Sequence, residues 1–518
     1  QLPSPPQRRL PTMSSSPFFR FGAAIDAGSS GSRIYLYRWP KTIGGEEELD
    51  DGGGSSSSSS RPRRERFVRV DRKAVFSDER TPGIGDDDGV GLDALDELVH
   101  AAADFLRAAG VDPGNVPIHL GATAGMRILA EEGPSLEGEI LSAARSSLRS
   151  SGFLFRDGWA RTISGEEEGV YDWLAANYLL EGGDGGDFLA SPSAAYGALD
   201  LGGASAQISF PLSTPSAGGG ERSLPPSADV HHREALRIDD VDYPLYTRSF
   251  LHYGVDQARV RYDTDVAAAS RNNPCYPAGY TDPDSDVSGS SEWEGCMHSV
   301  ASLFDETPSC DEGKEERCPI GGARRPPIED GRRFIAMSAF VYIWDYLGLQ
   351  TGKETEDLNA LNGKARRICN LTHEQQLARH RRRMENRPSK RTTTKPHAQC
   401  FNAAFAYHLL TKGYGIPASE TPIEVYFDID RTKVQWALGL MLVEANGLGI
   451  GSGLAFPKGE GGRRQLDVVA VGDAYGRLFG ISAAVLAALT LALGYLPCRR
   501  KRAPSVQDPC LPVVNPNV

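Results

Sequence analysis

Two short stretches of this sequence share a pattern that could bind phosphate. Residues 26–33 (DAGSSGSR) and residues 200–207 (DLGGASAQ) each begin with Asp after an apolar run, pass through small residues and return to apolar alternation. Each pattern predicts a strand, a tight turn and a second strand. Because no bulky side chain is in the way, the backbone N–H groups and Ser hydroxyls of such a turn can surround a phosphate.

The acidic residue that opens each turn adds a metal-binding function. Asp26 and Asp200 would lie beside the phosphate and could hold a divalent cation directly or through water. The alternative is a pair of Gly/Ser hairpins without function, but two copies in matching register, each headed by Asp, favour a binding site. The repetition predicts two similar lobes that face one nucleotide.

The stretch 116–127 contains a third candidate for anion binding. An apolar strand runs into Thr123-Ala124-Gly125, which opens a helix, and such a helix start favours an anion. A helix N-cap is the alternative role for Thr123.

A candidate general base lies in residues 163–173. Ser164 followed three residues later by Glu167 predicts a capping box, so the helix backbone occupies Glu167 and leaves Glu168 as the freer carboxylate. A run of three Glu residues is usually solvated surface. The position of Glu168 between the two Asp turns favours the role of base in a chain that otherwise has a phosphate site.

Composition limits the class of protein. The chain has 518 residues, 40% hydrophobic and 24% charged, which is enough for two or three globular domains. The net charge of −12 argues against a nucleic-acid partner. An anionic substrate would therefore be neutralised locally, by a metal ion and by backbone donors.

Cysteine usage indicates an oxidising compartment. Six of the eight cysteines precede the hydrophobic stretch near the carboxyl end, and no CxxC pair or nearby His pair supports zinc. The six predict three disulfides of open connectivity: Cys275, Cys296, Cys310, Cys318, Cys369 and Cys400. A glycosylation sequon at Asn370 fits the same setting.

Other segments organise the chain. We expect disorder in residues 1–20, a solvated low-complexity insert at 41–66, and a basic insert at 379–395 that is a disordered loop rather than a polyanion-binding patch. Helical periodicity predicts a helix at 92–109, and apolar runs predict helices at 334–349 and 434–442. The second helix is expected to be buried and is rich in aromatic residues. The third has Trp436 at its start, and Trp in such an apolar run is usually a core residue.

A membrane anchor is expected near the carboxyl end. Residues 479–496 are eighteen residues without a charge, followed at once by Cys-Arg-Arg-Lys-Arg. This predicts one transmembrane helix with a cytoplasmic tail at 497–518 and the large domain on the opposite side. We also expect an upstream segment, because the chain begins at Gln1.

The motifs in order resemble a known family. Residues 26–33, 121–127, 163–173, 200–207 and 435–439 are similar to the five apyrase conserved regions of the nucleoside triphosphate diphosphohydrolases. The resemblance implies an α/β, two-lobed actin-like (ribonuclease H-like) fold. It also implies hydrolysis of terminal phosphates of nucleoside di- and triphosphates, dependent on Ca²⁺ or Mg²⁺.

The resemblance also implies domain boundaries and residue roles. Lobe I would span 21–163, lobe II 164–429, and 430–470 would return to lobe I.

Catalysis would fall to the general base Glu168, with Ser205 and Gln207 holding the attacking water. The hydrated metal would be held by Asp26 and Asp200, with Thr123 and Trp436 near its water shell. The phosphate-binding residues would be Ser29, Ser30, Gly31, Ser32, Ala124, Gly202, Gly203 and Ala204. The six cysteines would pair in sequence order.

Three features of the sequence resemble the Golgi and lysosomal, diphosphate-preferring members of this family more than its cell-surface members. They are residues 29–40, the VQWALG form of the last region and the single anchor. We therefore expect the Golgi lumen first and the cell surface second. The base-stacking aromatic should fall near Val341 or Tyr342. The alternatives to an apyrase are a non-catalytic nucleotide-binding receptor on the same scaffold, and a kinase or chaperone ATPase with similar turns.

Overall fold

The computed structural model describes residues 19–28, 31–41, 67–85, 90–181, 191–212, 233–238, 241–267, 272–283, 285–304, 320, 328, 331–353, 355–386, 395–419 and 423–448. The predicted disordered start (except residues 19 and 20), the low-complexity insert beyond residue 41, the transmembrane segment 479–496 and the tail 497–518 lie outside these residues. Within the described part of the chain, no helix is both long and apolar enough to cross a membrane.

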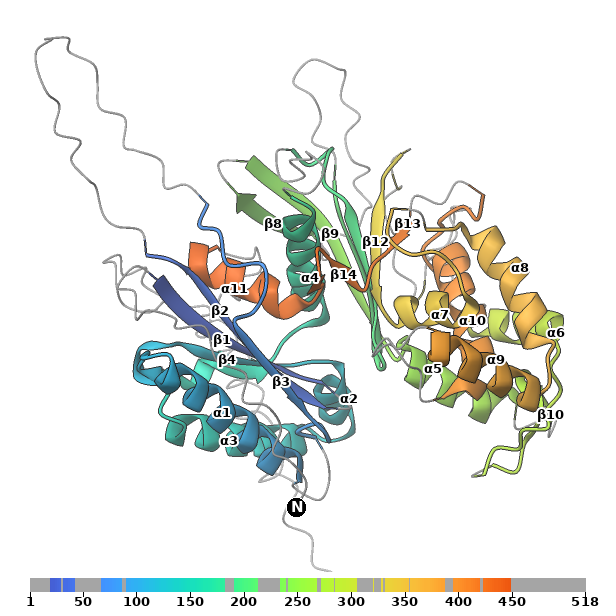
Figure 1. Cartoon of the computed structure of the whole chain (residues 1–518), viewed down its shortest axis with the longest axis horizontal. Helices are drawn as coiled ribbons and strands as arrows, with labels where there is room; N and C mark the ends of the chain where they lie inside the picture. The colour runs from blue at the N-terminus through green and yellow to red at the C-terminus, as the bar shows by residue number, and fades with distance from the viewer. Residues whose placement is uncertain are drawn as a thin grey trace, which may run out of the picture. The chain divides into compact units, whose positions relative to one another are not determined.

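The first sheet has the strand order β3-β2-β1-β4-β5 (Figure 1). Its strands are β1 (Phe19–Ala27), β2 (Ser32–Pro40), β3 (Phe76–Arg80), β4 (Ile118–Ala122) and β5 (Ala160–Thr162). The first three are antiparallel neighbours, whereas β4 runs parallel to β1 and β5 parallel to β4. Helices α1 (Val90–Ala108) and α3 (Pro134–Ser150) pack on this sheet, and α2 (Ala124–Glu132) follows β4. The predicted helix 92–109 corresponds to α1.

The second sheet repeats this topology with one additional edge strand. Its order is β13-β12-β6-β7-β9-β8. The strands are β6 (Gly197–Leu201), β7 (Ser205–Pro211), β8 (Arg233–Ile238), β9 (Val241–Leu251), β12 (Phe334–Ser338) and β13 (Ile423–Val425). Again a hairpin and a third antiparallel strand lie on one side of the first strand, and two parallel strands lie on the other. The chain is a mixed α/β protein in which one sheet topology occurs twice.

Two buried helices pack between elements of the two sheets. Helix α4 (Gly165–Leu180) contacts β6, β7 and β9, and α11 (Trp436–Asn446) contacts β1, β2 and α4. At Gly439 an added Cβ would lie 2.0 Å from the carbonyl oxygen of Tyr171, so the two helix backbones touch there. Any side chain at this position would force the helices apart.

Five further helices and strand β10 (Asn272–Ala278) form a hydrophobic core with one face of the second sheet. These helices are α5 (Val255–Arg261), α6 (Trp293–Ala301), α7 (Ala339–Leu347), α8 (Leu358–Cys369) and α10 (Gln399–His408). The described chain also has helix α9 (His373–Asn386) and the short strands β11 (Ser288–Gly289), β14 (Asp428–Ile429) and β15 (Thr432–Lys433). Disulfides Cys275–Cys296 and Cys369–Cys400 join β10 to α6 and α8 to α10. These are two of the expected pairs, and Cys310 and Cys318 lie outside the described residues.

The prediction of one helix over residues 334–349 is wrong. Residues 334–338 form β12, which pairs with β6 on one side and β13 on the other, and the helix begins only at Ala339. A strand buried on both faces is a continuous apolar run, and periodicity alone cannot distinguish it from a buried helix. Ser338, with φ of 59°, marks the change of conformation.

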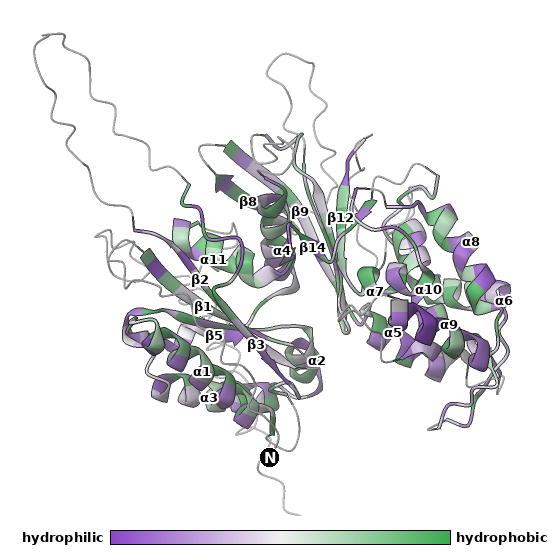
Figure 2. Cartoon of the chain, in the orientation of Figure 1, coloured by the Kyte–Doolittle hydropathy of each residue, from purple (hydrophilic) through white to green (hydrophobic). Residues whose placement is uncertain are grey.

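The prediction of a disordered loop at 379–395 is wrong for its first part. Residues 379–386 belong to helix α9, which Figure 2 shows as largely hydrophilic. The Arg379 guanidinium donates to the carbonyl oxygens of Tyr346 and Leu347 at 2.7 and 3.1 Å, at the carboxyl end of α7. Arg379 therefore caps the neighbouring helix, and Arg383 adds an ion pair with Asp345 at 2.9 Å. Residues 387–394 are outside the described range.

Candidate active site

The two Asp-headed turns are closed by equivalent backbone hydrogen bonds. In the first turn the N–H of Gly28 donates to the carbonyl oxygen of Gly31 at 3.1 Å, and in the second the N–H of Gly202 donates to that of Ser205 at 3.0 Å. In each hairpin the bond joins the residue two positions after the Asp to the residue five positions after it. The repeated sequence pattern therefore folds into a repeated turn.

Helix α5 holds the second turn in place. The N–H groups of Val255 and Asp256 donate to the carbonyl oxygens of Gly202 and Gly203, each at 2.9 Å. An added Cβ at Gly254 would lie 2.3 Å from the backbone nitrogen of Ala204, so only glycine permits this approach. These bonds fix the turn's shape before any ligand binds.

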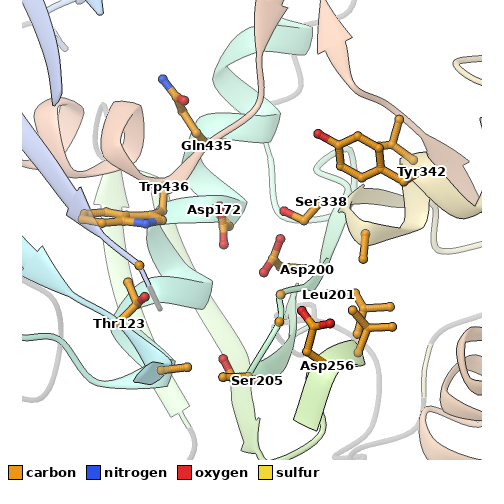
Figure 3. A pocket seen from close by; sticks show the side chains of 18 of the residues that line it. Thr123, Asp172, Asp200, Leu201, Ser205, Asp256, Ser338, Tyr342, Gln435 and Trp436 are labelled. Atoms are coloured by element: carbon orange, nitrogen blue, oxygen red, sulfur yellow. The ribbon is translucent and has the colours of Figure 1, made fainter. Parts of the chain in front are cut away.

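A cleft of about 590 Å³ lies where these turns meet. Its lining includes side chains or backbone from β1, α2, α4, the second turn, α7 and α11 (Figure 3). Ten of the residues predicted for the site line it: Asp26, Thr123, Ala124, Glu168, Asp200, Gly202, Gly203, Ala204, Ser205 and Trp436. Residues from widely separated sequence motifs are thus brought to one cavity.

Three other predicted site residues that the structure describes, Gly31, Ser32 and Gln207, are not part of the cleft lining. Ser32 is fully buried, and an added Cβ at Gly31 would lie 2.7 Å from the carbonyl oxygen of Arg80. Gln207 is buried directly behind Glu168, while Ser29 and Ser30 are outside the described residues.

The capping box on α4 is confirmed. The Ser164 hydroxyl accepts from the N–H of Glu167 at 3.1 Å, and the Glu167 carboxylate accepts from the N–H of Ser164 at 3.0 Å. The same carboxylate receives two bonds from the Arg161 guanidinium, at 2.5 and 2.8 Å. Glu167 therefore has a structural role at the start of the helix.

Glu168, expected to be the freer of the two carboxylates, has hydrogen-bond partners on one of its oxygens. Its Oε2 accepts from Arg127 at 2.9 Å and from the Gln207 amide at 3.0 Å. The Ser205 hydroxyl oxygen accepts from the same two side chains, at 3.0 and 2.8 Å. Arg127 and Gln207 therefore join Glu168 and Ser205 into one hydrogen-bonded network at the edge of the cleft.

Thr123 and Trp436 both begin helices and both line the cleft. Thr123 occupies the N-cap position of α2, but its side chain makes no capping hydrogen bond. Trp436 lines the cleft together with Asp26, and its ring stacks on Tyr171 with centroids 6.2 Å apart. Trp436, which is 6% exposed, is therefore both a core residue and a site residue.

Burial dominates the electrostatics of the cleft carboxylates. It raises the pKa of Asp200 to about 7, with the hydrogen bond from Ser338 opposing this and the charges of Glu168 and Asp26 adding to it. Burial also raises the pKa of Asp26, against Arg33 and Lys433, and that of Glu168, against Arg127. A cation in the cleft would stabilise the ionised carboxylates.

The donor set fits a hydrated divalent cation. Oxygen ligands and negative charge are what Ca²⁺ and Mg²⁺ require. Within the described parts of the chain, no three His, Cys, Asp or Glu side chains converge closely enough to hold a metal ion together. Water molecules and substrate oxygens would therefore complete the coordination.

The sequence interpretation missed several charged residues of the site, of which Arg127, Asp172, Arg33 and Lys433 lie nearest the predicted carboxylates in sequence or in space. Arg127 follows Thr123 by four positions, and Asp172 follows Glu168 by four. Helical spacing could therefore have placed Arg127 and Asp172 on the same helix faces as those two predicted site residues. Arg33 lies opposite Asp26 in the hairpin, a position that the register predicts once the turn is recognised. No sequence signal distinguishes Lys433, which precedes α11 and lines the cleft.

The fold and the site define a nucleoside phosphohydrolase with two sheets of one topology. A solved structure of nucleoside triphosphate hydrolases from Neospora caninum has the same fold, with a TM-score of 0.54 and 15% identity over 82% of this chain and 92% of that one. The chain belongs to the GDA1/CD39 (nucleoside phosphatase) family, whose pattern matches residues 14–455.

Curated relatives agree with this assignment. Ectonucleoside triphosphate diphosphohydrolase 2 of Gallus gallus is 31% identical over 460 residues, which are 82% of this chain and 83% of that protein. Ectonucleoside triphosphate diphosphohydrolase 3 of Mus musculus is 29% identical over 478 residues, 85% of this chain and 80% of that protein.

Proposed function

We propose that this chain hydrolyses the terminal phosphates of nucleoside di- and triphosphates, with UDP and GDP as leading substrates and ATP as a further one. The reaction is a metal-dependent attack of an activated water on the terminal phosphorus. The observation that carries the proposal is the network of Glu168, Ser205 and Gln207, which lies beside two phosphate-binding turns in one cleft.

Glu168 takes the proton of the attacking water. Both of its hydrogen bonds to Arg127 and Gln207 use Oε2, and Oε1 is the oxygen we assign to the water. Burial raises the pKa of this carboxyl, which makes its ionised form a stronger base than that of an exposed Glu. The Ser205 hydroxyl oxygen already accepts two bonds, so its hydrogen can be donated to the water.

The turns and the cation carry the phosphate charge. Backbone N–H groups of the two turns would contact the phosphates. Phosphoryl transfer is catalysed mainly by fixed hydrogen-bond donors and charge neutralisation, and needs little covalent chemistry from the protein. Asp26 and Asp200 would hold Ca²⁺ or Mg²⁺, with Thr123 and Trp436 near its water shell. When bound, the cation neutralises the phosphate oxygens.

Tyr342 is the residue we assign to the nucleobase. Both Val341 and Tyr342 line the cleft, but Tyr342 is half-buried, whereas Val341 is 1% exposed and packs in the core. Phe427 lies against Tyr342 with ring centroids 6.3 Å apart and lines the same cleft, so two aromatic rings are available at this end.

Phosphate release tests the proposal. The purified full chain should release phosphate from UDP, GDP and ATP in Ca²⁺ or Mg²⁺, and EDTA should stop the release. Tight nucleotide binding with no metal-dependent release from any nucleotide would instead support the non-catalytic receptor.

Replacing Arg127 should change the pH dependence of hydrolysis. The charge of Arg127 lowers the pKa of Glu168, so Arg127→Met should raise that pKa. Because the base must be ionised, the acid limb of kcat/KM should move to higher pH by about 1 unit or more. Arg127→Lys keeps the charge and is the matched control, with a smaller shift. An acid limb that stays in place in Arg127→Met would separate Arg127 from the base.

We propose an extracytoplasmic location, the Golgi lumen first and the cell surface second. The two disulfides require an oxidising compartment. The eighteen-residue span 479–496, which lies outside the described residues, suits a thin membrane better than a thick one. Asn370, exposed at the end of α8, is the proposed glycosylation site.

Protease protection tests this orientation. In sealed microsomes the domain that carries Asn370 should survive, and the tail after Cys498 should be trimmed. Surface biotinylation then separates the cell surface from the Golgi. Digestion of the large domain without detergent would contradict the orientation.

A further inference from the structure

A second cavity, which we call the rear cavity, lies on the other side of the two Asp-headed turns from the cleft. Its volume is about 280 Å³. A single water molecule needs only about 10–15 Å³ of such volume, so the rear cavity has room for a phosphate ion with water. Four residues line both the rear cavity and the cleft, and the first three belong to the turns: Gly28, Gly203, Ala204 and Asp256. The turns therefore form the partition between the two cavities.

The walls of the rear cavity come from separate parts of the fold. Residues of α2 line one side, and the second turn and α5 line another. The Nε2 atom of His252 lies 2.7 Å from an oxygen of Glu131 on α2. The N–H of the same His252 donates to the carbonyl oxygen of Ala204 at 2.9 Å. These contacts connect α2 to the second turn beside the rear cavity and help to hold its walls in place.

The lining of the rear cavity leaves a path for a small anion. Five of its described residues are glycines, which place no side chain in the path: Gly28, Gly83, Gly85, Gly125 and Gly203. Glu132 and Asp256 also line the cavity and are exposed, so the cavity reaches the surface. Their negative charges oppose tight binding of phosphate, which suits a passage better than a storage site.

The cleft itself is a poor route for the phosphate that hydrolysis releases. Asp200 and Glu168, at the reacting end, are each 8% exposed, whereas Tyr342, at the proposed nucleoside end, is half-buried. The phosphate is therefore released at the deeper end, with the nucleotide product in front of it. While that product stays bound, it occupies the path along the cleft.

We propose that inorganic phosphate leaves through the rear cavity, passing between Gly28 and the second turn, before the nucleotide product leaves through the cleft. The inference rests on the proposed hydrolysis and adds an order of product release to it. A nucleoside diphosphate formed from a triphosphate could then stay bound and lose its next phosphate without dissociating first.

Product inhibition measures this order on the purified full chain in Mg²⁺. The substrate is UDP, or whichever of UDP, GDP and ADP is hydrolysed fastest, because its monophosphate product has no further phosphoanhydride bond. If phosphate leaves first, the monophosphate competes with the substrate and phosphate inhibits non-competitively. We expect this pattern for wild type. Competition between phosphate and the substrate in wild type would overturn the inference.

Filling the rear cavity should reverse the order of release. Gln257 on α5 lines the rear cavity but not the cleft, so Gln257→Trp narrows the passage and leaves the cleft lining unchanged. We expect kcat to fall by at least about 5-fold, because product release becomes rate-limiting, and phosphate to become competitive. Val260→Trp is the matched control on the same helix, since Val260 is 56% exposed and lines neither cavity. This control should behave like wild type.

The outcomes separate this inference from the proposed function. Unchanged kcat and unchanged inhibition by phosphate in Gln257→Trp would overturn the inference. A lower kcat with phosphate still non-competitive would also overturn it, because that result indicates damage to the cleft and not a blocked passage. Glu132→Trp narrows the rear cavity from α2 and provides the same measurement if Gln257→Trp does not fold. A wild-type chain that releases no phosphate from any nucleotide would instead contradict the proposed function.

Discussion

Glu168→Gln should lose hydrolysis by about 10²–10⁴-fold, the scale for removing a general base. The amide cannot take a proton from water, but it keeps the size of the side chain and can still accept the bond from Arg127. Nucleotide binding should therefore change little. The unfolding temperature should change little as well, because burial already disfavours the charged form of Glu168 and raises its pKa. Single-turnover phosphate release, with nucleotide affinity measured in parallel, checks both expectations.

Glu167→Gln is the matched control, because it makes the same chemical change one residue earlier on the same helix. Glu167 is 2% exposed and pairs with Arg161, so removing its charge leaves a partly buried guanidinium without its partner. We expect a loss of about 3 kcal/mol in the free energy of unfolding and turnover within a few-fold of wild type. Equal damage to turnover by both substitutions would contradict the division of roles between Glu167 and Glu168.

Asp200→Ala should lose hydrolysis by at least about 10²-fold in Ca²⁺ and Mg²⁺ alike, because one of the carboxylates that bind the cation is gone. Raising the metal concentration should not restore the rate. Initial rates over a metal titration measure this, and Asp26→Ala should behave in the same way. An Asp200→Ala enzyme with full activity in millimolar metal would remove the second turn from the site.

Loss of activity in Asp200→Ala should not come from unfolding. The folded pKa of Asp200 is about 7, above the ordinary value of 3.8, so the metal-free folded state holds a proton that the unfolded state releases first. The stability of the metal-free wild type should therefore fall as pH rises from about 3.8 toward 7, by linkage. Asp200→Ala lacks the contribution of Asp200 to this dependence and should be at least as stable as wild type at neutral pH, which thermal unfolding in EDTA measures.

The parts of the site that local sequence encodes could be predicted. The turns at Asp26 and Asp200 and the capping box at Glu167 need only neighbours within a few residues, and each has the expected hydrogen bonds. The ion pair between Arg127 and Glu168 could not be predicted, because it joins α2 to α4 across 41 positions of sequence.

The sequence predictions that failed also have physical explanations. Residues 334–338 form a strand buried on both faces, and its continuous apolar run resembles a buried helix. Asp172 was overlooked because α4 is buried on nearly all sides, so an acidic residue there interrupts no apolar stripe. The structure places its side chain in the cleft that Asp200 also lines.

The steric course at phosphorus tests the central claim most directly. A nucleoside triphosphate whose terminal phosphorus is made chiral with sulfur and oxygen isotopes is hydrolysed, and the configuration of the released thiophosphate is determined. One in-line attack by a water that Glu168 activates predicts inversion of configuration. Retention would require two displacements through a covalent phosphoenzyme and would contradict the account.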